Sequence, residues 1–307
     1  HMLGSLNLAK IHLHSTNLYK SLEKETGQPT GFHETGSLRL AYKKEDLQWF
    51  HYVKGILDIA GSPCSIISTD EIHKYHPFIK LDGILGAFYT PEDGYTDPTS
   101  TTNAMAKGAR DNGAKIYRKN RVTDIEHLPN GEWKVITEKG NITCEHIVNA
   151  AGSFCPEVSQ MVGIKNVPSI NMVHQYLVTE SHPEIEKLDK ELPVVRDPDS
   201  SSYLRQEGKG LLIGPYEQDV AAWALDGMDW KFDMELLEPD LDRIEKHLEK
   251  GMDRIPQFKD VGIKRIICGP ITHTPDDNFL AGPAPGLKNF WMFCAASIGI
   301  AHGGGAG

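Results

Sequence analysis

Cysteine is scarce in this sequence, and it is unpaired. The 307 residues hold five cysteines, none of them in a CxxC pair, and the number is odd. Such a pattern fits a reduced compartment with buried thiols better than a disulfide framework. The five are Cys64, Cys144, Cys155, Cys268 and Cys294.

Basic residues are also fewer than acidic ones. Lys and Arg total 32 against 42 Asp and Glu, which gives a net charge of −10. We find no Lys/Arg-rich run and no apolar stretch long enough to span a bilayer. Nucleic acids and anionic membranes both select basic surfaces, so we expect neither as a partner.

Several chemical signatures are missing. The sequence contains no GxxxxGK[ST] phosphate loop, no HExxH zinc helix, no GxSxG elbow and no GxGxxG fingerprint. His73 and His76 lie one helical turn apart, but no cysteine or carboxylate set stands at ligand spacing beside them. We therefore expect surface histidines there and no bound metal.

Helical and strand patterns alternate along the chain. Leu8, Ile11, Leu18 and Leu22 share one helical face, and Gly27 is placed to end that helix. The stretches "RVTDIEHL", "EWKVITE" and "NITCEHIVNAAG", separated by turn residues, predict an antiparallel meander. The segment "SSYLRQEGKGLLIGPYE" predicts a hairpin around 207–210. The fold class is therefore mixed, α+β or α/β.

The stretch "CEHIVNAAGSFCPEV" ends a buried strand on small residues. Ala150, Ala151 and Gly152 offer almost no side chain where the strand stops. Small residues at the carboxyl end of a strand let a ligand approach the backbone, which is where open α/β sheets bind ligands. Close packing of the next helix would explain the same residues, and the segment alone leaves both readings open.

A glycine tract, "SIGIAHGGGAG", closes the chain at an expected helix start. The free backbone amides of a helix start attract anions, above all phosphate. The stretch "GPITHTPDDNFLAGP" precedes it and sets Pro/Gly turns around an apolar segment. Each of these features is weak evidence for a ligand site on its own, whereas their order along the chain is a more specific signal.

That order resembles the dimethylglycine and sarcosine dehydrogenases, flavoproteins of the glycine-oxidase and D-amino-acid-oxidase group. The matching stretches are "LYKSLEKETGQPTGFHETGSLRLA", "EDGYTDPTSTTNAMAKGARDNGA", "HIVNAAGSF", "VHQYLVT", "YLRQEGKGLLIGPYE", "GPITHTPD" and "GIAHGGG". The resemblance implies a partial, Rossmann-like FAD-binding domain with a β-meander, entwined with an antiparallel-sheet substrate domain. It assigns 1–27, 91–164 and 262–307 to the first and 28–90 and 165–261 to the second.

The resemblance also implies which residues touch FAD. Val122 would hold the adenosine part, and many relatives carry Trp at the position of Phe154. Relatives often have more glycine around Ser297 and Ile298. The full implied set is Val122, Ala151, Gly152, Phe154, Ser297, Ile298, Gly299, Ile300, Ala301, His302, Gly303 and Gly304.

The sequence departs from the family at both ends. Family members begin with a strand, a GxGxxG loop and a histidine that bonds covalently to the flavin in many members. They continue beyond the position of Gly307 with a final helix and a folate-binding domain, so tetrahydrofolate is a possible second cofactor of a longer protein. We expect a fragment that binds FAD poorly on its own and is inactive alone.

The implied reaction is oxidation of an N-methylated glycine, with hydride passing from the N-methyl carbon to flavin N5. The substrate amine must lose its proton first, because an ammonium has no lone pair. His174 in "VHQY" suits that task, and Tyr176 lies on the same strand face. The residues alone favour a hydrogen-bonded structural histidine at His174, and the family resemblance reverses that preference.

The substrate carboxylate needs a cationic or hydroxyl partner. Tyr203 and Arg205 alternate on one face of the predicted hairpin, and Tyr216 lies on the partnering strand. Arg can grip a carboxylate with two parallel hydrogen bonds. An ordinary ion pair of Arg205 with Glu207 or Glu217 is the alternative.

Two other functions compete with this one. The substrate could be sarcosine or another secondary amine, because one methyl group in an apolar pocket is worth only about 1–3 kcal/mol. The second alternative is not an enzyme: it is a flavin-free binding or assembly module with the same fold. The expected partner is a small N-methylated amino acid, with an unidentified electron acceptor, in bacterial cytoplasm or a mitochondrial matrix.

Overall fold

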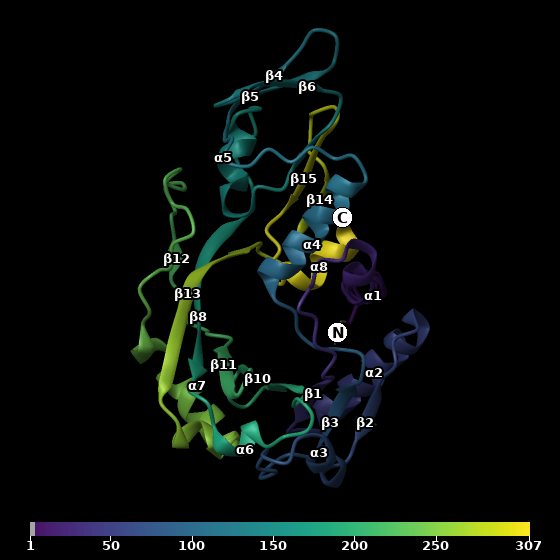
Figure 1. Ribbon diagram of the computed structural model, residues 1–307, viewed down its shortest axis with the longest axis vertical. Coiled ribbons are helices and arrows are strands. Elements are labelled where there is room, and N and C mark those ends of the chain that lie inside the picture. The colour runs from purple at the N-terminus through teal and green to yellow at the C-terminus, as the bar shows by residue number, and fades with distance from the viewer. Residues whose placement is uncertain (1–3) are drawn as a thin grey trace.

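The computed structural model describes residues 4–307, and its largest unit is a curved nine-stranded sheet (Figure 1). Its order is β12-β8-β11-β10-β9-β1-β3-β2, with β13 also paired to β8. The strands are β1 (Ser37–Ala41), β2 (Ser65–Ile67), β3 (Gly86–Thr90), β8 (Ile170–Thr179), β9 (Val194–Asp197), β10 (Ser202–Glu207), β11 (Gly210–Pro215), β12 (Ala222–Trp223) and β13 (Ile263–His273).

The two faces of this sheet differ in chemistry. One row of directly opposed apolar residues crosses five neighbouring strands and is buried in the main core. The next row along the strands points to the other face and is mostly polar, as the two-residue period of a strand requires. The apolar row is Leu38, Val195, Leu204, Ile213 and Leu177.

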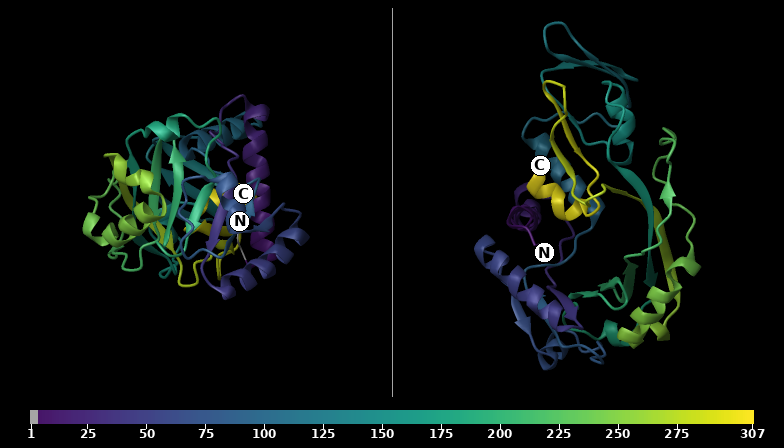
Figure 2. Two further views of the ribbon diagram at one scale, coloured as in Figure 1. Left: turned by 90° about the horizontal axis from the view of Figure 1, so that it is seen from below. Right: turned by 180° about the vertical axis from the view of Figure 1, so that it is seen from behind.

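Helices cover the apolar face, which is the convex side of the sheet (Figure 2). The most amphipathic of them, α7 (Leu241–Arg254), buries Ile244 and packs Leu248 and Met252 against the core. Gly251 is required at the crossing with β11, because a Cβ there would lie 2.2 Å from Ile213 Cδ1. The other elements on this face are α3 (Thr69–Tyr75), α6 (Pro183–Glu186) and η2 (Pro256–Asp260). Helix α2 (Lys44–Ala60) packs instead on Ala41 and Phe88, which point to the other face.

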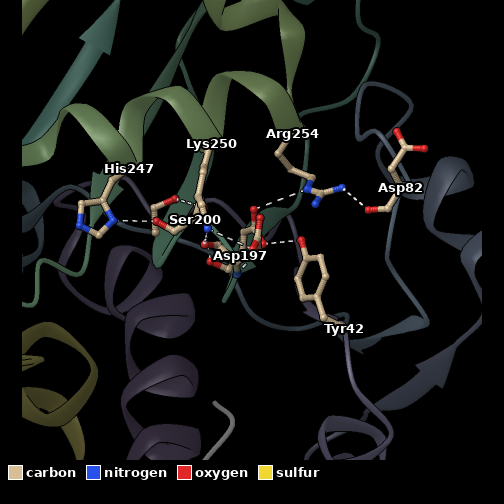
Figure 3. Close-up of polar contacts among 9 residues, drawn as sticks. Tyr42, Asp82, Asp197, Ser200, His247, Lys250 and Arg254 are labelled. Atoms are coloured by element: carbon tan, nitrogen blue, oxygen red, sulfur yellow. Dashed lines mark hydrogen bonds and ion pairs between the residues drawn. The ribbon is translucent and has the colours of Figure 1, made fainter.

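A buried polar network ties the end of α7 to the sheet (Figure 3). The Tyr42 hydroxyl donates to Asp197 Oδ1 over 2.5 Å, and Arg254 Nε lies 3.5 Å from Asp197 Oδ2. The Arg254 guanidinium also donates to the carbonyl of Asp82 and lies over the Tyr42 ring. One buried carboxylate thus joins α7 and β9 to the residue that follows β1.

Two small sheets lie beyond the large one. The first, in the order β14-β15-β7, contains β14 (Leu280–Pro283), β15 (Phe290–Cys294) and β7 (Ile147–Asn149). The second is the predicted antiparallel meander of β4 (Val122–His127), β5 (Trp133–Thr137) and β6 (Gly140–Cys144). They share a core in which the Trp133 indole donates to the carbonyl of Lys288.

The meander corrects one expectation. The stretch "NITCEHIVNAAG" is two strands rather than one, because the chain leaves the second sheet after Cys144 and enters the first at Ile147. The short helices η1 (Gly152–Phe154) and α5 (Cys155–Gln160) follow β7.

A helical group formed by both ends of the chain lies on the concave side of the large sheet (Figure 1). Its members are α1 (Leu6–Thr26), α4 (Pro98–Asp111) and α8 (Gly299–Ala306). Gly27 ends α1 in the left-handed conformation, as predicted. The predicted leucine face is only partly right, because Leu8, Ile11 and Leu18 are half-buried while smaller and polar residues make the closest contacts.

The architecture confirms the mixed α and β class. Among the described helices, none combines the length and apolar character needed to cross a bilayer. Strand β13 lies in the large sheet although its residues fall within 262–307, which the sequence assigned to the FAD-binding part. The division into two domains stays a proposal.

Candidate active site

The two glycine-rich stretches of the sequence follow neighbouring parallel strands. β7 and β15 pair in parallel, with Met292 opposite Asn149. The chain continues from β7 into Gly152 and from β15 into Gly299, so both stretches leave the same edge of the sheet. That edge is where open α/β sheets place ligands.

A buried side chain holds the turn after β7. Asn149 Nδ2 donates to the carbonyl of Cys155 and to Ser159 Oγ, both at 3.0 Å, and Asn149 Oδ1 accepts from Ala151 N at 3.2 Å. After β15, Ala295 is buried with a φ of 57°, a conformation uncommon for a residue with a Cβ. Strained residues of this kind concentrate at functional sites.

The exposed part of this edge leaves the backbone open to a ligand. Gly152 has a φ of 56°, is exposed and has no atom within 4 Å of a Cβ built on it. The nearest atom to a Cβ on Gly299, also exposed, is Ala296 Cβ at 3.9 Å. Both backbones can therefore be approached closely, as a bound FAD would require. Ser297 is half-buried beside them, and Ile298 and Ile300 are exposed.

The rest of α8 packs against α1 instead. The Tyr19 hydroxyl donates to Ile300 O at 2.6 Å and accepts from Gly304 N at 3.1 Å. A Cβ on Gly304 would lie 2.9 Å from Ser15 Cα, and the His302 ring is buried beside Phe279 at 4.5 Å between centroids. Helix packing therefore accounts for Gly304 and His302 in this structure.

Phe154 has a protein partner that the sequence did not indicate. Its ring stacks on Trp230, with centroids 5.1 Å apart and planes 16° from parallel. The Arg121 guanidinium lies over the same indole at 5.6 Å. Val122, next to Arg121, is half-buried and packs on the core that the two small sheets share. A loop of more than 15 residues between β12 and α7 supplies Trp230, and no local pattern predicts where such a loop docks.

Strand β13 connects this edge to the large sheet. η1 lies against β13, and β13 pairs along the length of β8, with Gly269 opposite His174. The strand that carries His174 is therefore separated from the Gly152 turn by one strand only.

His174 is the first member of a hydrogen-bonded chain. Its Nε2 lies 3.2 Å from His273 Nε2, and His273 Nδ1 lies 3.0 Å from Asp277 Oδ1. Because a carboxylate only accepts, His273 donates through Nδ1, and the Nε2 of the neutral ring must accept. His174 then donates through Nε2, which leaves a lone pair on its Nδ1.

A buried carboxylate lies near this nitrogen. His174 Nδ1 lies 3.9 Å from Glu217 Oε2, too far for a hydrogen bond but close enough to stabilise a cation. Arg243 Nε lies 3.4 Å from the same oxygen. Burial is the main cause that lowers the pKa of His174 to about 4, and the charge of the neighbouring His273 is the next. The ring is therefore neutral at pH 7, well above the pH range in which it takes up a proton.

The tyrosines chosen from the sequence share the polar face with His174. Tyr176 lies two residues along β8, and the Tyr203 and Tyr216 rings are 5.7 Å apart. The Tyr203 ring lies over Gly214, where a Cβ would be 2.1 Å from Cζ. Burial raises the pKa of Tyr203 to about 12, so its hydroxyl stays protonated and can donate.

The Arg205 guanidinium already forms an ion pair within the chain. Its Nη1 lies 2.6 Å from Glu207 Oε2, and its guanidinium lies over the Tyr95 ring at 4.2 Å. The ion pair that the sequence offered as an alternative is therefore present. A role for Arg205 in holding substrate would require it to leave Glu207.

Comparison with known proteins agrees with this geometry. The sequence matches the family described as FAD dependent oxidoreductase (DAO) over residues 2–307. The chain belongs to this family. Mitochondrial dimethylglycine dehydrogenase of Rattus norvegicus is 42% identical over 98% of the chain, and mitochondrial sarcosine dehydrogenase of Mus musculus is 34% identical over 94%. The crystal structure of L-proline dehydrogenase from P. horikoshii superposes with a TM-score of 0.81 at 26% identity, covering 96% of this chain and 75% of that one.

The chain spans only about a third of those curated relatives, 36% of the rat protein and 31% of the mouse protein. The family consists of FAD-dependent oxidoreductases, so FAD is the cofactor that membership implies. The exposed backbone at Gly152 and Gly299 fits that cofactor. The particular substrate and the roles of single residues are proposals.

Proposed function

We propose that the chain is the part of a flavin-dependent amine oxidoreductase that oxidatively demethylates N-methylated glycines such as dimethylglycine. The observation that carries this proposal is the position of His174, one strand away from the turn at Gly152. A neutral imidazole with a free lone pair thereby lies close to the edge that fits FAD.

FAD, when bound, supplies the oxidising power by accepting a hydride from the N-methyl carbon of the substrate. Residues around Gly152 and Gly299, with Val122 and Phe154 nearby, would hold it. The residues of the chain have other tasks: they bind the amine, orient it, exclude water and remove its proton.

His174 Nδ1 accepts the ammonium proton of the substrate in this proposal. The proton leaves the substrate nitrogen, which regains its lone pair, and bonds to Nδ1. The anion near the imidazolium formed is Glu217, whose carboxylate is 1% exposed and 3.9 Å from Nδ1. Water screens their attraction little, which offsets part of the cost that burial imposes on the protonated ring.

The tyrosines orient the substrate. Tyr176 on β8 and Tyr203 on β10 stand on the same face of the sheet, with β11 between their strands. The protonated phenol of Tyr203 can donate a hydrogen bond to a carboxylate. Such positioning accelerates a reaction by holding the reacting atoms in line.

The test is a substrate panel on the longest native polypeptide that contains the chain, loaded with FAD. Dimethylglycine, sarcosine and N-methyl-L-alanine are each supplied with an artificial electron acceptor, and formaldehyde and acceptor reduction are measured together. We expect oxidation of dimethylglycine or sarcosine with formaldehyde as product. FAD binding without oxidation of any of the three would overturn the proposal, and failure to bind FAD would favour an assembly module.

A further inference from the structure

The polar face of the large sheet carries two arginines in directly opposed positions. Arg39 on β1 pairs with Arg196 on β9 in the parallel register. Directly opposed side chains project from the same face of a sheet with Cβ atoms about 4.5–5.5 Å apart. Like charges at such positions repel, so the arrangement costs stability unless an anion joins them.

Neither guanidinium has a carboxylate partner. Within residues 4–307, ion pairs shorter than 4.0 Å engage Arg205, Arg243 and Arg254, but neither Arg39 nor Arg196. Both side chains are half-buried, where an unneutralised charge is expensive. Burial and then the charge of Arg196 lower the pKa of Arg39, in keeping with two cations held close together.

More distant charges do not remove this excess. Asp46 on α2 acts on Arg39, and the buried Asp93 acts on Arg196, but both lie beyond ion-pair distance of these guanidiniums. Asp46 is already engaged by the backbone N–H of Tyr42 at 2.9 Å. The pair therefore remains a net positive site on this face.

The arginines belong to a row of directly opposed residues on the face of the sheet that also carries His174. Tyr203 lies directly opposite Arg196, and Gly214 lies directly opposite Tyr203. The Tyr216 hydroxyl accepts a hydrogen bond from Arg196 Nη1, which fixes the guanidinium toward this row. Gly214 leaves room for the Tyr203 ring, because a Cβ there would lie 2.1 Å from Tyr203 Cζ.

We propose that Arg39 and Arg196 form the carboxylate-binding site for the amino-acid substrate, with Tyr216 positioning Arg196. The assignment rests on the proposed function for the identity of the substrate. The chemistry is that of a carboxylate bridging two guanidiniums, each donating charge-assisted hydrogen bonds. Arg205, which already has Glu207, is not part of this site.

The first experiment measures anion binding without any turnover. Thermal unfolding is followed in sodium acetate and in sodium chloride at equal ionic strength, for the wild type, Arg196→Gln and the matched control Arg205→Gln. We expect acetate to raise the melting temperature of the wild type and of Arg205→Gln, and to leave that of Arg196→Gln unchanged, because only a ligand of the folded state stabilises it. In chloride, Arg196→Gln should melt no lower than the wild type, since one of two repelling charges is gone.

The second experiment uses the FAD-loaded enzyme. Arg39→Gln and Arg196→Gln should each raise the KM for dimethylglycine about tenfold or more, because a charge-assisted contact is lost. The KM for N,N-dimethylethanolamine, which has no carboxylate, should stay within about twofold by the same reasoning. Arg196→Lys, which keeps the charge, should recover part of the loss.

The proposal is overturned if acetate does not raise the melting temperature of the wild type, if Arg196→Gln keeps the acetate effect, or if the KM for dimethylglycine is unchanged in both glutamine variants. An enzyme that oxidises no N-methylated amino acid would overturn the proposed function but not the acetate result. The two hypotheses therefore fail separately.

Discussion

His174 and His273 lie on adjoining strands with their Nε2 atoms 3.2 Å apart. Asp277 Oδ1, 3.0 Å from the other nitrogen of His273, determines which of the two rings donates. A carboxylate that is 67% exposed thus selects the tautomer of a half-buried imidazole through an intervening ring. His273 and Asp277 are positioning residues for His174.

Replacement of Asp277 by Asn should therefore disturb the tautomer of His174. Long-range ¹H–¹⁵N NMR correlations distinguish Nε2–H from Nδ1–H, and we expect the Nε2–H form of His174 in the wild type. In Asp277→Asn, the Nδ1–H form should appear, because His273 is no longer held by a carboxylate. The matched control is Asp260→Asn, which removes a carboxylate 3.9 Å from His182. A wild-type His174 already protonated at Nδ1 would refute this assignment.

Buried histidines should make the fold sensitive to acid. The expectation of a surface histidine at position 76 was wrong, because His76 is fully buried. Burial lowers its pKa from 6.5 to about 3, and neither of its ring nitrogens has a hydrogen-bond partner. Between these two values the unfolded chain binds the proton and the folded chain does not, so stability falls as the pH drops from 6.5 toward 3. One such group contributes a slope of up to about 1.4 kcal/mol per pH unit.

His76→Phe keeps an aromatic ring beside Phe78 and removes the proton site. Urea unfolding between pH 7 and pH 4 should therefore show a shallower loss of stability in this variant. The control is His51→Phe, at an exposed position on α2, whose acid slope should match the wild type. Equal slopes in all three proteins would show that His76 does not carry the effect.

Two neighbouring glycines of α8 should respond in opposite ways to alanine. A Cβ on Gly305 would lie 2.1 Å from the backbone oxygen of Ile11, so Gly305→Ala must push α8 away from α1. We expect a loss of about 1–3 kcal/mol in the free energy of unfolding. The nearest atom to a Cβ on Gly303 is Tyr19 Oη at 3.7 Å, so Gly303→Ala should be neutral, or stabilising by up to about 1 kcal/mol. Denaturant titration of both variants decides; a similar change in both would contradict the packing argument.

Gly152 offers a way to disturb the cofactor without disturbing the fold. Its left-handed φ of 56° is tolerated by Asn, and open space surrounds its Cβ position. Gly152→Asn should keep its melting temperature within a few degrees and weaken FAD binding about tenfold, a loss of about 1.4 kcal/mol. Gly163→Asn, at another left-handed glycine with open surroundings, is the control. Fluorescence titration with FAD in the longest native polypeptide measures both, and equal affinities would remove Gly152 from the cofactor site.

Local patterns predicted the elements whose partners are close in sequence. The helix ending at Gly27, the hairpin of β10 and β11, and the meander all follow from periodicity and turn residues. The small residues after β7 correctly indicated an exposed backbone at a strand end. The break between β6 and β7 was missed, because two residues suffice to pass from one sheet to another.

Non-local pairings could not be predicted in the same way. Arg39 and Arg196 are separated by more than 150 residues and meet only because β1 and β9 pair in parallel. His273 meets His174 through the pairing of β13 with β8, and its own sequence carries no signal of that contact. The face of α1 was misjudged because its partner α8 is rich in glycine, which admits small and polar residues at close range rather than leucines.

The proposed function depends on His174 as the base that deprotonates an N-methylated glycine. The direct measurement is anaerobic mixing of the FAD-loaded protein with dimethylglycine, following the loss of visible flavin absorbance over a range of pH. The wild type and Asp260→Asn should be reduced rapidly and alike, whereas His174→Ala should be slower by about 10²–10⁴-fold, the usual contribution of a general base. Reduction of His174→Ala at the wild-type rate, with an unchanged pH profile, would contradict the account.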